Sequence, residues 1–319
     1  MSNTLVIAHV IEGHVTDVTL QAVAKAKTLG SPVHALVIGQ GVAPLAASLT
    51  AAGCDAVHVA ETDKLATYVT TPFLRVAQSV VQSGSYGLIL LPASTMGNDL
   101  APVLAAKLNA ACVLDADDVK VEGGSTLVRR TEFDRKAGTW FSAVSGKTMI
   151  ATLKDGVAET PTPDTAKAGT VNTVAVSLTE ADLKAHVLKR DVAKPTVNLK
   201  GAKIIVAAGA GVGNKDNFSK ITDLATKLGA QIGATRAVVD AGWLPADHQI
   251  GQTGATVKPD LYIACGISGA VQHWVGMMDS RTIVSINSDK NAPLMKRAHY
   301  RIAGDLNVVL PKLTKLIAS

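Results

Sequence analysis

Short apolar runs alternate with stretches of helical periodicity along the first 110 residues. Continuous runs of Val, Ile, Leu and Ala predict buried strands at residues 4–10, 33–38, 56–60 and 87–91. Between these runs the apolar residues recur at helical spacing, which predicts helices over 17–29, 43–53, 64–83 and 98–109. A strand–helix alternation of this kind indicates a parallel sheet with helices on both faces.

The pattern changes after the segment CVLDADDV. The runs STLVRRTEF, GTWFSAVS and KTMIATL are short, β-like and separated by glycine-containing turns, with no helical stretch between them. They predict an antiparallel extension of the first domain. Residues 156–170 are rich in proline and small polar residues and predict a surface loop.

A second α/β alternation begins near residue 200. Residues 180–201 combine charges, a proline and little apolar periodicity, as interdomain linkers do. Beyond them we predict strands at 203–208, 261–265 and 282–286 and a helix at 217–229, and HYRIAG is also strand-like.

The length supports two domains, because the chain has 319 residues and single cores stop growing at about 250–300 residues. We predict an α/β protein of two domains, each a mostly parallel, Rossmann-like sheet flanked by helices. The first domain, residues 1–194, includes the β extension and the linker, and the second spans residues 195–319.

Composition excludes several other classes of protein. Hydrophobic residues make up 47% and aromatic residues 3%, which suits small side chains packed on a buried parallel sheet. Apolar runs stay short of the roughly 18 residues that span a bilayer, and the start has no signal-peptide pattern, so we expect a cytoplasmic protein. The net charge is +5, but the basic residues are scattered and few aromatic residues could stack on bases, so nucleic acid is not an expected partner.

Cysteine usage adds no site. Cys54, Cys112 and Cys265 are odd in number, far apart and without Cys/His metal spacing. Neither a disulfide nor a zinc site is indicated, and we predict three buried apolar thiols.

Polar groups follow several strand ends of the second domain. The turn 209–213 follows the first strand, Ser268, Gln272 and His273 follow the strand 261–265, and Asn287 follows the next strand. Asp305 follows HYRIAG, and the loop Gly251–Gly254 lies between these positions. Ligands of open α/β sheets bind beyond the carboxyl ends of the strands. The pattern therefore predicts one extended site for a long ligand, such as a dinucleotide.

Two of these features have ordinary alternatives. The turn 209–213 has the spacing GxGxG rather than GxGxxG, and no acidic residue follows at the expected distance, so a plain tight turn explains it equally well. Arg236 and Asp240 stand four residues apart, which taken alone favours an ion pair on a helix surface.

Four segments of the second domain together resemble a known family. GATRAVVDAGWLPADHQIGQTG, PDLYIACGISGAVQHWVGM, IVSINSD and APLMKRAHYRIAGDL resemble, in this order, the flavin-binding domain of the alpha subunit of electron-transfer flavoproteins. The first domain resembles the same family more loosely, at LLPASTMGNDLAPVLAAKL. Since it shows no phosphate fingerprint, we expect it to have a structural role and to contact the partner subunit.

The resemblance implies that residues 195–319 bind FAD in an extended form, with the flavin ring facing a smaller beta subunit. By motif position, Arg236 would lie over the ring, Thr253 would offer its hydroxyl near N5, and His273 would point at the carbonyl O2. The implied cofactor-binding residues are Thr235, Arg236, Ile250, Gly251, Gln252, Thr253, Ser268, Gly269, Ala270, Val271, Gln272, His273, Asn287, Asp305 and Leu306.

Within this set, the stretch 268–273 would approach the ribityl and pyrophosphate groups, and Asn287 and Asp305 would hold the adenosine end. One position departs from the family, because Ala210 stands where an Arg is common in the first glycine turn. We expect Lys215 or backbone amides to replace that phosphate contact.

The implied function is that of a bacterial electron carrier. It would form a heterodimer with a beta subunit that binds AMP. With FAD bound, it would accept electrons from flavin-containing dehydrogenases and pass them through a downstream acceptor to the respiratory chain. The motifs contain no nucleophile, metal cluster or acid/base dyad, which agrees with a carrier rather than an enzyme. Two alternatives stay open: an NAD(P)-dependent oxidoreductase that uses the 209–213 turn, and a non-redox adenine-nucleotide-binding module.

Overall fold

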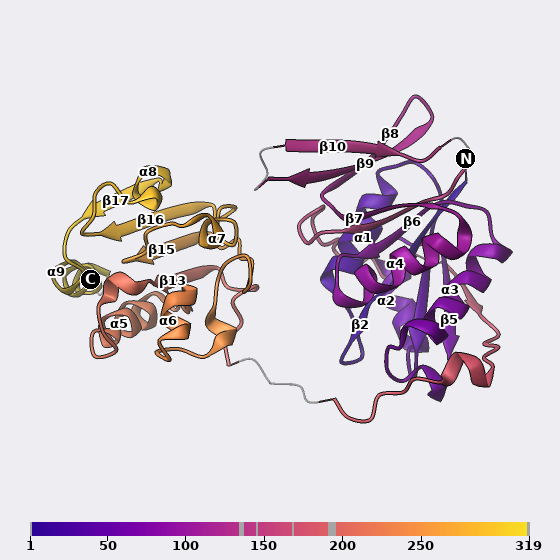
Figure 1. Ribbon diagram of the computed structural model, residues 1–319, viewed down its shortest axis with the longest axis horizontal. Coiled ribbons are helices and arrows are strands. Elements are labelled where there is room, and N and C mark those ends of the chain that lie inside the picture. The colour runs from indigo at the N-terminus through magenta and orange to yellow at the C-terminus, as the bar shows by residue number, and fades with distance from the viewer. Residues whose placement is uncertain (1, 134–136, 145, 168, 191–195, 318–319) are drawn as a thin grey trace. The chain divides into compact units, whose positions relative to one another are not determined.

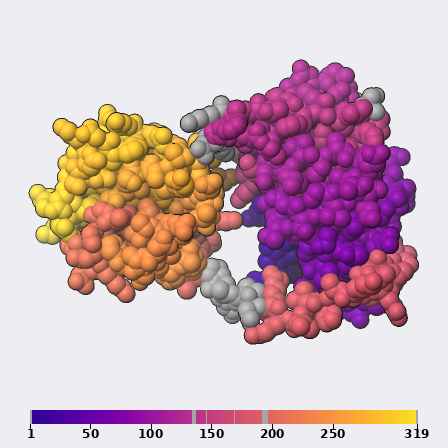
Figure 2. All heavy atoms as spheres, viewed as in Figure 1, coloured from indigo at the N-terminus to yellow at the C-terminus, as the bar shows by residue number. Residues whose placement is uncertain are grey.

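The computed structural model describes residues 2–133, 137–144, 146–167, 169–190 and 196–317. The chain divides into two compact units, Met1–Arg190 and Asp191–Ser319, and Figure 2 shows each of them densely packed within itself. The boundary predicted near residue 195 lies outside the described residues.

Parallel strands form the main sheet of the first unit. Within the described residues it has seven strands, in the order β12-β5-β4-β1-β6-β11-β7, and neighbouring strands pair in parallel throughout. The strands are β1 (Asn3–Ile7), β4 (Val33–Gly39), β5 (Ala56–Glu61), β6 (Tyr86–Pro92), β7 (Ala111–Ala116), β11 (Met149–Leu153) and β12 (Thr170–Thr173). The predicted α/β class is confirmed.

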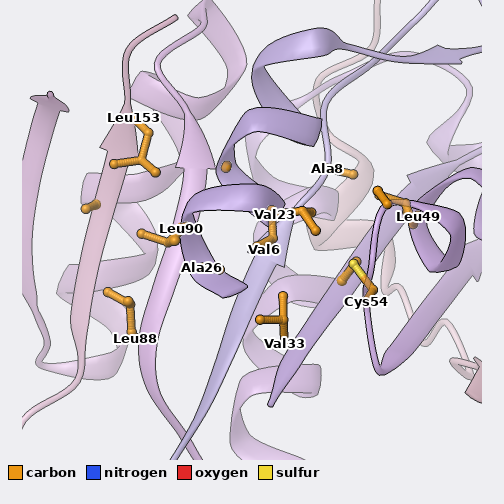
Figure 3. Close-up of a cluster of buried hydrophobic side chains, with 14 of the residues drawn as sticks. Val6, Ala8, Val23, Ala26, Val33, Leu49, Cys54, Leu88, Leu90 and Leu153 are labelled. Carbon is orange, nitrogen blue, oxygen red and sulfur yellow. The ribbon is translucent and has the colours of Figure 1, made fainter. Parts of the chain in front are cut away.

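Helices cover both faces of this sheet (Figure 1). They are α1 (Asp17–Lys27) and α2 (Ala46–Ala51) on one face, and α3 (Thr70–Ser83) and α4 (Thr95–Leu108) on the other. Central strand β6 is apolar on both sides because both faces are covered. Its Leu88 and Leu90 pack with Val6 and Val23 in the cluster shown in Figure 3, and Ile89 packs in the opposite cluster.

The predicted antiparallel extension is confirmed in part. Strands β8 (Asp118–Glu122), β9 (Ser125–Glu132) and β10 (Ala137–Ser142) pair antiparallel. The prediction is wrong for KTMIATL, because β11 lies in the parallel sheet between β6 and β7. All five residues of β11 are buried, as a strand covered on both faces requires.

Two further segments differ from the predictions. The first strand ends at Ile7 and is followed by a small hairpin of β2 (Val10–Ile11) and β3 (His14–Val15). The predicted loop 156–170 gives way at Thr170 to edge strand β12.

The predicted linker 180–201 is anchored at both ends. A short 3-10 helix, η3 (Glu180–Leu183), carries the buried Asp182, whose carboxylate accepts a hydrogen bond from Arg75 Nε at 2.7 Å. That bond, with two from Thr179, holds the pKa of Asp182 at about 2. At the other end, Leu199 is buried in the core of the second unit. The segments on either side of residues 191–195, which lie outside the described residues, are therefore packed on the two units.

The second unit is a smaller parallel sheet. In the part of the chain that the structure describes it has five strands, in the order β14-β13-β15-β16-β17. The strands are β13 (Ile204–Ala208), β14 (Gln231–Ala234), β15 (Leu261–Cys265), β16 (Thr282–Asn287) and β17 (Tyr300–Ala303). The helices are α5 (Phe218–Leu228), α6 (Arg236–Asp240) and α9 (Leu306–Ile317), which pack on one face, and α7 (Val271–Trp274) and α8 (Pro293–Arg297), which pack on the other.

Two of the three cysteines have the predicted burial. Cys54 and Cys265 are buried as predicted, but the prediction is wrong for Cys112, which is exposed in the outermost strand β7. Every helix among the described residues is too short or too polar to cross a bilayer.

Candidate functional site

A cavity lies at the carboxyl edge of the second sheet. The chain passes from β13 to β14 on one side and then crosses back to β15 on the other side of β13, so the strand order reverses between β13 and β15. Ligands of open α/β sheets bind at such switch points. The cavity has a volume of about 670 Å³, within the roughly 300–1,000 Å³ of ligand pockets. It is lined by residues that follow β13, β14, β15 and β16 and by the loop 249–253.

Close contact between two backbone segments shapes this edge. Gly209 N donates to the carbonyl of Cys265 at 2.8 Å, and Gly211 N donates to the carbonyl of Gly266 at 3.0 Å. A Cβ atom on Gly209 would lie 2.3 Å from the carbonyl oxygen of Gly266. Glycine is therefore required where the turn after β13 meets the end of β15.

This contact corrects the phosphate-binding interpretation of the 209–213 turn. Its amides on Gly209 and Gly211 are already hydrogen-bonded to the end of β15. Moreover, the turn forms only a single 3-10 turn over Ala210–Val212, and α5 begins at Phe218, so the turn does not form an α-helix N-terminus. Lys215, the expected substitute for the family's Arg, is exposed and is not among the residues that line the cavity.

The loop Gly251–Gly254 packs against the backbone of α7. Gln252 N donates to the carbonyl of Gln272 at 2.7 Å. Gly251 has φ +143°, and a Cβ atom there would lie 2.7 Å from the same carbonyl oxygen. Thr253 Oγ1 accepts a hydrogen bond from Gln249 Nε2 at 2.9 Å, so its own hydroxyl proton is available to donate.

The segment after β14 supplies a hydroxyl and a cation. The Thr235 hydroxyl oxygen is buried and has no hydrogen-bond partner among the described residues, although Thr235 lines the cavity. Arg236 also lines the cavity, and its Nε lies 3.2 Å from Asp240 Oδ2, so the helix-surface ion pair is present. The Arg236 side chain is 71% exposed, so this pair contributes only about 0.3–0.5 kcal/mol.

His273 is buried and uses both ring nitrogens within the protein. Nδ1 lies 2.9 Å from the carbonyl oxygen of Ile250, and Nε2 lies 2.9 Å from the Tyr262 hydroxyl. Since a carbonyl only accepts, Nδ1 carries the proton and Nε2 accepts from Tyr262. Burial lowers the pKa of His273 to about 4, so the ring is neutral at pH 7. The implied donation to a flavin carbonyl would require His273 to give up one of these two bonds.

Asn287 joins two backbone segments at the end of β16. Its amide nitrogen donates to the carbonyl of Ile267 at 3.1 Å, and its amide oxygen accepts from Asp289 N at 3.0 Å. Asp289 itself lines the cavity. Sequence reasoning missed this carboxylate, although its place just beyond a strand end was the available signal.

Most of the expected cofactor residues come together here. Those that line the cavity are Thr235, Arg236, Ile250, Gly251, Gln252, Thr253, Ser268, Gly269, Ala270, Gln272, His273 and Asn287. Lining residues absent from the expected set are Gly209, Ala210, Gly211, Ala237, Gln249, Gly266, Ile267, Asp289 and Ala292.

The remaining three expected residues are not among those that line the cavity. Val271 begins α7 and is 38% exposed. Asp305 accepts a hydrogen bond from Asn307 N at the start of α9. Leu306 is buried in the core beneath that helix, which explains why an apolar residue follows the capping carboxylate.

Comparison with known proteins identifies the class. The electron transfer flavoprotein domain matches residues 4–179, and the electron transfer flavoprotein FAD-binding domain matches residues 198–278. The protein is therefore a flavoprotein, and its second unit contains the FAD-binding domain.

Curated relatives match along nearly the whole chain. The electron transfer flavoprotein subunit alpha of Bacillus subtilis is 39% identical over 317 residues, which cover 98% of this chain and 96% of the relative. Protein FixB of Clostridium saccharobutylicum is 39% identical over 95% of this chain and 92% of its own length. The subunit alpha of Mycobacterium tuberculosis is 38% identical over 99% and 98%. The chain belongs to the electron transfer flavoprotein family, among its alpha subunits.

The cavity fits the FAD that this domain binds. It is large, it follows several successive strand ends, and the glycines at its edge leave no side chain between the backbone and a ligand. The unpaired Thr235 hydroxyl also fits, because a buried hydroxyl without a partner costs about 1–3 kcal/mol unless a ligand satisfies it.

The buried His273 predicts an acid sensitivity of the second unit. Its pKa is about 4 in the folded protein and 6.5 when unperturbed. The unfolded chain therefore binds a proton first as the pH falls, and stability is lost between pH 6.5 and pH 4. The shift corresponds to about 3 kcal/mol. Native-state hydrogen exchange of the β15 amides should show that the unfolding free energy falls more steeply over this range in the natural protein than in His273→Gln.

The exposed His14 provides the control, since His14→Gln should keep the pH dependence of the natural protein. Parallel curves for His273→Gln and the natural protein would contradict the assignment.

Proposed function

We propose that this chain is the alpha subunit of a heterodimeric electron carrier and not an enzyme. It would take electrons from flavin-containing dehydrogenases and pass them through a downstream acceptor to the respiratory chain. The observation that carries the proposal is the cavity at the switch point of a domain that matches the family's FAD-binding domain. The relatives support the subunit assignment, because their printed names are those of alpha subunits and they match over nearly their whole length.

Several lining residues would each contact a different part of FAD. When bound, FAD supplies reversible electron uptake at its flavin ring. Thr253 has a hydroxyl proton to donate, and the Thr235 hydroxyl needs a partner. Asp289 offers a carboxylate at the end of β16 that suits ribose hydroxyls. A contact of Asp305 with the adenosine end stays a prediction.

We expect Arg236 to tune the reduction potential of the flavin through its positive charge. His273 is neutral, whereas Arg236 carries a full positive charge at the cavity. A cation beside the ring favours the negative charge that reduction brings. At about 4 Å and an effective dielectric near 20, one charge is worth about 4 kcal/mol, or a ceiling of about 170 mV. Exposure and the Asp240 partner place the actual effect well below that ceiling.

The proposal also covers the partner subunit and the location of the protein in the cell. The first unit would contact the beta subunit, and AMP would bind in that partner. A cytoplasmic location agrees with the bacterial source of the relatives. A nicotinamide-dependent oxidoreductase is less well supported, because two amides of the 209–213 turn are hydrogen-bonded within the protein and the turn does not begin an α-helix.

Co-purification provides the first test. The chain expressed with its beta partner should purify as a yellow heterodimer and release one FAD per alpha chain on denaturation, measured by absorbance and chromatography of the released flavin. A colourless heterodimer that binds NAD(H) or only adenine nucleotides would contradict the proposal.

Replacing Arg236 tests the electrostatic part. In the FAD-loaded heterodimer, Arg236→Ala should lower the flavin midpoint potential by tens of millivolts because a cation is lost beside the ring. Spectroscopic redox titration measures the change, and salt should reduce it.

The matched control is Arg281→Ala, which removes an Arg of the same unit that is 82% exposed, pairs with Asp260 and does not line the cavity. Its potential should stay that of the natural protein. Equal shifts in both variants, or none in Arg236→Ala, would show that Arg236 does not act on the flavin.

A further inference from the structure

Two histidines and a tyrosine meet on the main sheet of the first unit. His34 Nδ1 lies 3.0 Å from the Tyr86 hydroxyl oxygen, and His58 Nε2 lies 3.0 Å from the same oxygen. The two histidine nitrogens are 3.5 Å apart. The function proposed above uses none of these side chains, and they come from a different unit than the cavity.

Strand pairing explains why they converge. His58 on β5 stands opposite Leu36 of β4, so it shares a face with His34 two residues earlier. Tyr86 begins β6 and its ring packs in the cluster of that face, with Leu5 and Leu36. The tyrosine therefore reaches across β1, which lies between β4 and β6.

The three atoms form a triangle of the size that a metal ion requires. With metal–nitrogen distances of about 2.0–2.1 Å and tetrahedral angles, the ligand atoms of zinc stand about 3.3 Å apart. The observed separations of 3.0, 3.0 and 3.5 Å bracket this value. We propose that His34, His58 and Tyr86 form a binding site for a divalent transition-metal cation of the zinc and copper class, with a fourth position open to solvent.

Negative charge near the site comes from Asp55, which also pairs with Lys27 Nζ at 3.3 Å, and from the end of α3. The carboxylate of Asp55 acts on His34, where it partly offsets the effect of burial on the imidazole. Gly84, the C-cap of α3, lies against the Tyr86 ring, since a Cβ atom on Gly84 would lie 2.3 Å from a ring carbon. The carbonyl end of a helix carries a partial negative charge.

The protonation states of the two imidazoles suit metal binding, whereas the phenol of Tyr86 must lose its proton when the metal binds. Burial lowers the pKa of His34 and His58, so both imidazoles are neutral at pH 7 and above. Burial raises the pKa of Tyr86, so the free phenol keeps its proton. When the metal–oxygen bond forms, the phenol O–H bond breaks and one proton leaves to the buffer. Each imidazole keeps one proton, on the ring nitrogen that does not bind the metal.

Donor type narrows the cation. Imidazole nitrogens suit zinc, copper and nickel, whereas magnesium and calcium require oxygen ligands. Among the described residues, His, Cys, Asp and Glu side chains form no group of three that could hold a metal, so the proposed site depends on Tyr86 as its third ligand. Both histidines are half-buried, so an ion can enter from solvent.

Zn(II) titration of the FAD-loaded heterodimer at pH 8 tests the proposal. Calorimetry in two buffers of different ionisation enthalpy should show one equivalent bound per alpha chain with release of one proton. The ultraviolet difference spectrum should show tyrosinate formation at the same equivalence point. Mg(II) should produce neither signal.

Variants identify the ligands. His34→Gln and His58→Gln should each weaken Zn(II) binding at least about 100-fold, beyond the 10–100-fold typical of losing a residue that only supports a ligand. Tyr86→Phe keeps the ring and should abolish the tyrosinate signal and the proton release. His14→Gln, the exposed histidine of β3, should bind Zn(II) as the natural chain does.

Two results would overturn the proposal. One is the absence of a saturable tyrosinate signal in the natural heterodimer, a measurement that depends on no variant. The other is Zn(II) affinity in Tyr86→Phe and the two histidine variants equal to that of His14→Gln. FAD content, measured on the same samples, reports on the proposed function separately.

Discussion

Close backbone contact between the ends of β13 and β15 is the constraint on which the second unit depends. Gly209 and Gly211 bond directly to the carbonyls of Cys265 and Gly266, at a separation that no side chain permits. Gly266 takes φ +64°, and the chain then runs through Ser268, whose carbonyl accepts from Leu294 N at the start of α8. The contact thus fixes the backbone position of residues 266–268, which lead into α7.

Helix α7 in turn holds the loop 249–254 through hydrogen bonds. His273 holds the carbonyl of Ile250, and the carbonyl of Gln272 accepts from Gln252. Tyr262 bonds to the other ring nitrogen, so the orientation of the imidazole is set from within the core, and burial keeps the ring neutral. His273 positions the loop in this arrangement, and the exposed Arg236 brings a positive charge to the cavity lining.

Sequence patterns predict those strands and helices whose apolar pattern depends only on their own burial. The strand 261–265 matches β15 because a run that is apolar on both faces needs no knowledge of its partners. KTMIATL was misassigned because its apolar run does not reveal that β11 pairs with β6 and β7. Most of the expected cofactor residues line one cavity, since strand ends of a parallel sheet meet at one edge. The bonds of His273, the contact of Gly209 with Gly266 and the anchor of Asp182 join distant positions, and no spacing rule predicts them.

The central claim is that FAD binds across the strand ends of the second unit. Hydrogen–deuterium exchange of the heterodimer with FAD bound and with FAD removed tests it most directly. Our account predicts that FAD slows exchange in the segments 209–211, 249–254 and 266–273 and leaves the strand ends of the first unit, such as residues 92–95, unchanged. Slowed exchange confined to the first unit would contradict it.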